Sequence, residues 1–240
     1  MIIVLAEIGV PQDKIKELAD ERSPESLHKL FNKHKTIVTE ELRFLHDVHS
    51  VINTFLDLLT EGLSATETEL TVTEMQEKRI ILGDVNSYID GDGFHKEYMR
   101  FCNTPHIPKL NLASPVGGYF ESMDEFLDEP SLPTRFFSVD PNGNESKAKG
   151  LYLVGYTRGY YGSTNDLPLR MAQYAEQNEL VYNGPVYNIY LHDEMSINEP
   201  EQYLLQVSAS VRETRRVTTR RTVAHTFKLE KAKTRKLTTL

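Results

Sequence analysis

The chain has 240 residues, of which 39% are hydrophobic and 26% are charged, a composition that is ordinary for a globular protein. No apolar run approaches the ~18 residues that a membrane span needs, and residues 1–6 lack the basic leader of a secretory signal. A single cysteine, Cys102, excludes an internal disulfide framework and is typical of the reducing cytoplasm, where we expect the protein to reside.

The first 62 residues are predicted to be helical. Residues 1–22 contain a turn at Gly9 and a helix with Pro11 in its first turn. A second helix is expected over residues 23–62, with Ser23 as its N-cap, Glu25 near the positive end of its dipole and Gly62 as its C-terminal cap.

Apolar residues repeat every seven positions along this second helix. This spacing predicts a coiled coil roughly 50 Å long at about 1.5 Å per residue, with a second copy of the chain as the simplest partner. A second apolar register beside the first makes the stripe wide enough to pack on other helices as well. The predicted dimerisation residues are Phe31, Val38, Leu45, Ile52 and Leu59.

A polar linker over residues 63–69 separates the helical part from a region of different pattern. From residue 70 to residue 211, short β-type runs alternate with two amphipathic segments, over 94–103 and from about 166 to 178. The order is strand, helix, strand, strand, apparently twice. We therefore expect an α+β fold in which two such repeats place their helices on one face of a sheet, with a cleft between the copies.

The last segment, residues 212–240, is strongly basic. It holds ten Lys or Arg against two Glu, so the rest of the chain is more acidic than the overall net charge of −8 indicates. Such a tail binds nucleic-acid phosphates without contacting the bases, or it pairs as an added strand, or it remains without fixed structure. Charge alone does not choose between these alternatives.

Two regions of the chain resemble the MerR family of transcription regulators, in its BmrR-like branch. Residues 5–18, continuing into 23–27, resemble the helical segment that follows the winged DNA-binding unit of that family. Residues 70–211 resemble a GyrI-like effector-binding domain, most clearly at 157–162, 184–190 and 200–203. The resemblance implies a sensor that binds a small hydrophobic or aromatic effector and works as a homodimer.

The DNA-reading part of such a regulator would precede residue 1, and no second helix-turn-helix is recognisable downstream. We therefore expect DNA contact only through a missing head domain, through a heterodimer partner, or weakly through the basic tail. The alternative function is a stand-alone GyrI-like protein that binds or sequesters a small molecule or another protein. The DNA upstream of Met1 would discriminate the two, because an in-frame helix-turn-helix there marks a regulator.

The resemblance places a ligand pocket on the face of residues 188 and 190, where tyrosines stack flat molecules. Each tyrosine alone is as consistent with an ordinary strand residue as with a ligand contact, whereas the group favours a pocket. The candidate ligand-binding residues are Tyr119, Tyr152, Tyr156, Tyr160, Tyr161, Asn188 and Tyr190.

Asn188 departs from the family, in which this position is usually a glutamate. An amide offers hydrogen bonds typically worth ~1 kcal/mol, whereas a buried carboxylate attracts a lipophilic cation strongly. We therefore expect weak or no preference for cationic ligands, and we expect no hydrolysis that depends on that glutamate. The acidic pair Asp193 and Glu194 is interpreted as solvated.

Other chemistry finds little support in the sequence. His46 and His49, with Asp47 beside them, lie three residues apart on the predicted helix, but two histidines without a further ligand are better explained as solvated side chains. There is no nucleophile elbow, P-loop or dinucleotide fingerprint. We expect no cofactor, no metal and no catalytic residues.

Overall fold

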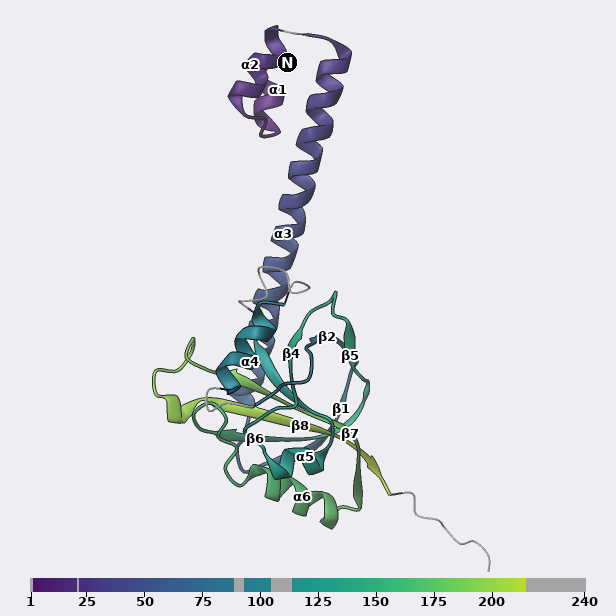
Figure 1. Cartoon of the computed structure of the whole chain (residues 1–240), viewed down its shortest axis with the longest axis vertical. Coiled ribbons are helices and arrows are strands. Elements are labelled where there is room, and N and C mark those ends of the chain that lie inside the picture. Colours follow the sequence, from purple (N-terminus) through teal and green to yellow (C-terminus); the bar gives the residue numbers. More distant parts are fainter. Residues whose placement is uncertain (1, 21, 89–92, 105–113, 215–240) are drawn as a thin grey trace, which may run out of the picture.

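The computed structural model describes residues 2–20, 22–88, 93–104 and 114–214. A long helix, α3, projects from an α+β domain, and two short helices pack against its far end (Figure 1). The helices are α1 (Ile2–Glu7), α2 (Gln12–Asp20), α3 (Pro24–Ser64), α4 (Gly93–Cys102), α5 (Met123–Asp128) and α6 (Leu167–Gln177), with a 3₁₀ turn η2 (Pro200–Gln202). Most of the basic tail, residues 215–240, lies outside the described residues. Within those residues, no helix combines the length and the apolarity that a membrane crossing requires.

The helix α3 begins as the sequence predicts. The Ser23 side chain accepts a hydrogen bond from the Ser26 backbone N–H at 3.0 Å, and Pro24 occupies the first turn. Its 41 residues correspond to a length of about 60 Å. The predicted end is wrong: Gly62 lies inside the helix, which continues to Ser64. Gly62 is required there for space, because a Cβ on it would lie 2.5 Å from the His192 Nε2 atom.

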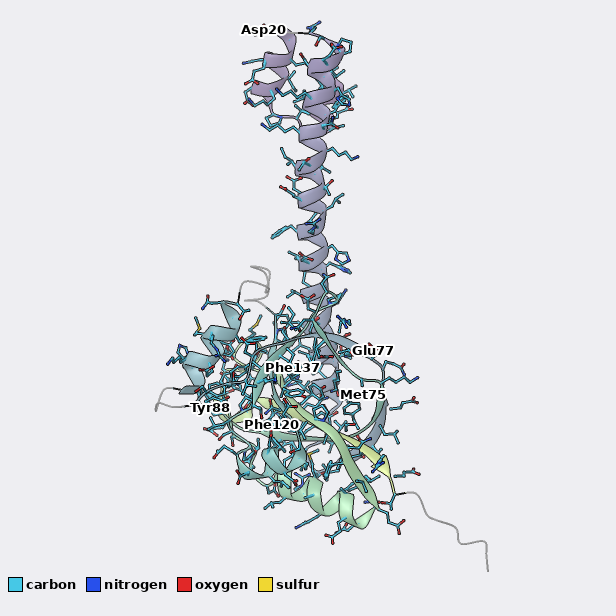
Figure 2. The ribbon with its side chains drawn as sticks, turned by 45° about the vertical axis from the view of Figure 1, so that its right-hand side comes forward. Asp20, Met75, Glu77, Tyr88, Phe120 and Phe137 are labelled. Carbon is cyan, nitrogen blue, oxygen red and sulfur yellow. The ribbon has the colours of Figure 1, made fainter. Side chains whose placement is uncertain are left out.

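The first two helices form a small core on the N-terminal part of α3. Their buried residues are Leu5, Val10, Ile15 and Leu18, which pack against Leu27 and Leu30 of α3. The His34 Nε2 atom lies 2.6 Å from the Ile8 carbonyl oxygen and so ties the end of α1 to α3. Asp20 marks this end of the molecule, far from Phe120 and Phe137 in the sheet domain (Figure 2).

Within the described residues, eight antiparallel strands form one curled sheet in the order β1-β6-β8-β7-β3-β4-β2-β5. The predicted repeat is present as β2-α4-β3-β4 and β6-α6-β7-β8, with β1, β5 and α5 as additions that the repeat does not include. Each repeat pairs its strands in the same relative order, and the two halves meet where β3 pairs with β7. The strands are β1 (Leu70–Met75), β2 (Lys78–Leu82), β3 (Val116–Phe120), β4 (Arg135–Val139), β5 (Glu145–Lys147), β6 (Gly150–Arg158), β7 (Leu180–His192) and β8 (Leu204–Glu213).

The two faces of the sheet carry different partners. Phe120 packs with Phe126 of α5 and Met171 of α6, and Val116, two pleats away on the same face of β3, packs with Phe101 of α4. The helices α4, α5 and α6 therefore share one face, as expected. Phe137 and its neighbours on the opposite face pack against Leu58 in the last turns of α3.

Candidate ligand-binding cleft

A cleft of about 710 Å³ opens on the helix-bearing face, at the junction of the two repeats. Its walls come from α4, from β3 and β7, from the turn after β6 and from the loop after β7. Phe55 of α3 also lines it. A second hollow of about 420 Å³ lies between α3 and the turn after β4, where oppositely charged residues such as Arg43 and Asp140 give no consistent ligand chemistry. The larger cleft is therefore the candidate site.

The floor of the cleft is formed where the central strands meet. Gly118 of β3 is paired with Asn188 of β7, and the Gly118 backbone N–H donates a hydrogen bond to the Asn188 Oδ1 atom at 2.7 Å. A Cβ on Gly118 would lie 2.4 Å from that Oδ1 atom and 2.7 Å from the Pro133 Cβ atom. The Asn188 and Pro133 side chains therefore cover Gly118, which has to be a glycine for lack of space.

One wall of the cleft consists of three tyrosines, Tyr160, Tyr161 and Tyr190, which are among the ligand-binding candidates from the sequence. The Tyr161 ring lies 4.8 Å from the Tyr190 ring and 5.6 Å from the Tyr160 ring, centroid to centroid. The Tyr190 hydroxyl accepts a hydrogen bond from the Gly162 N–H and donates one to the Tyr160 carbonyl oxygen. Burial raises the pKa of Tyr190 to about 12, so its hydroxyl stays protonated at neutral pH.

The turn after β6 shapes this tyrosine wall. Gly162 adopts φ +84°, a left-handed conformation that suits glycine. The Tyr161 hydroxyl donates to a carboxylate oxygen of Glu194 in the loop after β7. Glu194 is exposed, as predicted, but it lies with Asp193 at the edge of the cleft rather than away from it. Negative charge therefore lines one side of the opening.

The opposite wall comes from α4, and sequence reasoning missed it. Phe94 and Tyr98 both contact Phe136 edge-on, at centroid distances of 5.4 and 5.7 Å, and all three residues line the cleft. Burial raises the pKa of Tyr98 to about 12. The signal was present, because Phe94 and Tyr98 are four residues apart on a predicted helix and so lie on one side of it.

Three predicted site residues lie on the other face of the sheet, so the expectation that all seven candidates share one cleft is wrong. The Tyr119 ring packs on Tyr187, 5.4 Å away, the Tyr152 hydroxyl donates to the Ala148 carbonyl oxygen, and the Tyr156 hydroxyl donates to Glu61 of α3. Strand alternation is the physical reason: in β6 it is Leu153 that faces α6, so its neighbours point the other way.

That other face holds a half-buried lysine, Lys147. The Lys147 ammonium donates to the Ser208 hydroxyl at 2.7 Å and lies 4.8 and 4.7 Å from the ring centroids of Tyr152 and Tyr187. Burial, followed by the charge of Lys78, lowers the pKa of Lys147 to about 7. Glu61 accepts hydrogen bonds from Tyr156 and Gln206 nearby. The two Glu61 hydrogen bonds fix the end of α3 on the sheet.

The remaining sequence candidates are distributed along α3. His46 and Asp47 line the smaller hollow, and no group of three or more potential metal ligands lies together in the described ranges. Four of the five predicted dimerisation residues have exposed side chains, with Leu45 at 59% and Ile52 at 52%. Leu59 is half-buried.

No protein-family model matches the chain. The chain is 20% identical over 219 residues to the multidrug-efflux transporter 2 regulator of Bacillus subtilis (strain 168), a similarity that covers 89% of this chain and 79% of the regulator.

The solved structures that align with this chain are similar to it only at a low level. The EcmrR–DNA complex, solved by cryo-EM, aligns with 14% identity and a TM-score of 0.41, covering 89% of this chain and 81% of that one. A hydrolase from Listeria innocua aligns with 14% identity and a TM-score of 0.43, covering 63% and 96%. SAV2435 bound to tetraphenylphosphonium aligns with 14% identity and a TM-score of 0.34, covering 60% and 94%.

The fold is an α+β domain with a candidate ligand-binding cleft, carried on a long helix. The similarity to the Bacillus subtilis regulator covers 89% of the chain and therefore both of these parts. This similarity supports the resemblance to a BmrR-like MerR regulator with a GyrI-like domain that was inferred from the sequence. A ligand-binding regulatory role is the functional class that this resemblance supports.

Proposed function

We propose that this chain is the ligand-sensing and dimerisation part of a MerR-family, BmrR-like transcription regulator, and that it holds a small hydrophobic effector in the cleft. The observation that carries the proposal is the cleft itself. Its volume of about 710 Å³ falls in the range of ~300–1,000 Å³ that is typical of small-molecule sites. Aromatic rings from Phe94 and Tyr98 on one wall and from Tyr161 and Tyr190 on the other are placed to hold a flat molecule between them.

The exposed apolar stripe of α3 supports homodimerisation. Large apolar side chains at this exposure are costly in water over such a length, and the heptad spacing matches a helical partner. The simplest partner is a second copy, whose own α3 carries the same stripe. Phe31, Val38, Leu45 and Ile52 are the residues that we propose to bury in the dimer.

The contacts of α3 offer a route from the cleft to this dimer helix. Phe55 lines the cleft, so an effector inside it reaches the helix directly. On the other face of β7, His192 contacts Gly62 in the last turns of the same helix. An effector that shifts β7 or Phe55 would therefore move α3. That movement would be transmitted to DNA bound by a head domain or by a heterodimer partner.

We propose binding without catalysis at this site. Asn188 occupies the position at which the resembled family carries a glutamate, and an amide neither donates nor removes a proton at neutral pH. The carboxylates nearest to the cleft are Asp193 and Glu194, and Glu194 is engaged by the Tyr161 hydroxyl. An ester substrate that is hydrolysed faster with the chain than with a Glu194→Gln variant would contradict this part of the proposal.

A thermal-shift titration tests whether the cleft binds a ligand. A ligand that binds only the folded chain raises the unfolding midpoint, and the rise saturates with ligand concentration. With the neutral probe 9-methylanthracene, we expect a saturable rise for the wild-type chain and a much smaller one for Phe94→Ala. The Tyr119→Phe variant, altered on the opposite face of the sheet, serves as the control and keeps the rise. Equal shifts in all three proteins would refute the assignment.

A further inference from the structure

The orientation of the Asn188 amide is fixed by its partner. The Gly118 backbone N–H is a donor only, so the atom that faces it at 2.7 Å has to be the amide oxygen rather than the amide nitrogen. The two residues are directly paired across β3 and β7, which holds this contact in place. The Nδ2 group, with its two N–H bonds, is therefore turned away from Gly118.

This amide nitrogen is available to a ligand. Asn188 is half-buried and lines the cleft, and no acceptor among the residues that the structure describes is hydrogen-bonded to its Nδ2 atom. Two neighbouring hydroxyls are already used, because Tyr190 donates to the Tyr160 carbonyl and Tyr161 donates to Glu194. A molecule that covers the floor without accepting from Nδ2 would leave a desolvated donor unpaired, at a cost in affinity.

The charges around the cleft restrict the acceptor further. Asp193 and Glu194 line one side of the opening and disfavour an anionic ligand. The donor at the floor disfavours a cation placed against it. A neutral acceptor, such as the carbonyl of an aromatic ketone or amide, satisfies both conditions.

We propose that the effector is a flat, neutral aromatic molecule whose carbonyl oxygen accepts a hydrogen bond from the Asn188 Nδ2 group. Its ring lies in the cleft between the tyrosine wall and α4, beside the Asn188 amide. This inference rests on the proposed ligand-binding function and names the chemical class of ligand for the same site. Asn188 then acts as a specificity-determining residue. Its oxygen accepts a hydrogen bond from Gly118, and its nitrogen donates one to the ligand.

A matched pair of probes tests this assignment. Fluorene and 9-fluorenone share one tricyclic skeleton and differ by a methylene group in place of a carbonyl. Water solvates the ketone better, so hydrophobic transfer alone would favour fluorene. By equilibrium dialysis, we expect the wild-type chain to bind 9-fluorenone about fivefold to tenfold more tightly, the effect of one net hydrogen bond.

The Asn188→Asp variant isolates the donor. It keeps an oxygen for the Gly118 N–H and replaces the N–H groups with a second acceptor, so the preference for 9-fluorenone should fall to about onefold or reverse. Asn183→Asp is the matched control, because Asn183 lies in the same strand, accepts a hydrogen bond from Ser210 through its Oδ1 atom and does not line the cleft. This control should keep the wild-type preference.

The outcomes separate this inference from the function on which it rests. Saturable binding of both probes with equal affinity by the wild-type chain overturns the inference and leaves the cleft proposal standing. Absence of binding by either probe overturns both. If Asn188→Asp does not fold, the side-chain amide resonances of Asn188 in the wild-type chain decide: a shift with 9-fluorenone but not with fluorene supports the donor role, and equal shifts refute it.

Discussion

The last turns of α3 contact β7 through Gly62 and His192, where a Cβ on the glycine would lie 2.5 Å from the imidazole Nε2 atom. His192 is buried, so its ring has little room to move aside. The contact joins the dimer helix to the strand that also carries Asn188 and Tyr190 on its cleft side. A helical glycine at this point is therefore explained by packing between the arm and the sensor.

Replacing Gly62 with alanine should destabilise the chain despite the better helix propensity of alanine. Propensity contributes about 1 kcal/mol in favour of the variant, whereas overpacking against His192 costs about 1–3 kcal/mol. Urea denaturation gives the net change in the free energy of unfolding. In a His192→Ala background the steric term disappears, so Gly62→Ala should there become stabilising. A destabilisation of the same size in both backgrounds would show that His192 is not the cause.

Placing a charge in the apolar stripe of α3 should separate the dimer. Leu45→Glu would bury a carboxylate at a position whose side chain is 59% exposed in the single chain. We expect sedimentation equilibrium to show an association constant lowered by on the order of 100-fold. Thr39→Glu adds the same charge to an exposed polar position of the same helix and should leave the dimer intact. A wild-type chain that sediments as a monomer at all concentrations would contradict the proposed pairing.

The half-buried Lys147 predicts a dependence of stability on pH. Its pKa is lowered to about 7 in the folded chain by burial, from an ordinary value of 10.5. Between these values the unfolded chain binds a proton that the folded chain does not, so the stability contributed by this group rises as pH increases through about 7.

A comparison with Lys147→Met isolates this effect. The free energy of unfolding of wild type minus that of the variant should increase between pH 6.5 and pH 9, by no more than about 1.4 kcal/mol per pH unit. Lys149→Met, altered at an exposed lysine two residues along, should change with pH as the wild type does. A flat difference for Lys147→Met would mean that the amine is solvated in the folded chain.

Local sequence patterns predicted the helical arm and most strands, because caps, heptads and strand alternation depend on neighbours in the chain. Ser23 and the start of α6 at Asp166 are examples. The cleft depended on pairing between distant strands. Alternation divides β6 into two faces, yet only the packing of Leu153 against α6 shows that Tyr152 and Tyr156 face α3 instead. The role of Gly62 likewise arises from His192, 130 residues away in the sequence.

Asn188 predicts that the cleft has little preference for cations. The dissociation constants of 10-methylacridinium and 9-methylanthracene, which have similar shape and differ in charge, should agree within about threefold, because the floor offers a donor and the carboxylates lie at the edge. Asn188→Asp should introduce a preference for the cation. A strong cation preference of the wild type that disappears in Glu194→Gln would show that the edge carboxylate, rather than Asn188, determines the charge of the ligand.

The location of the ligand is the central claim, and a single set of dissociation constants tests it. Equilibrium dialysis with 9-methylanthracene compares wild type with Tyr161→Ala, in the tyrosine wall, and with Tyr152→Phe, on the opposite face. Loss of one aromatic contact should weaken binding by about tenfold in Tyr161→Ala and leave Tyr152→Phe unchanged. Weakened binding in Tyr152→Phe with unchanged binding in Tyr161→Ala would place the ligand on the other face of the sheet and contradict the account.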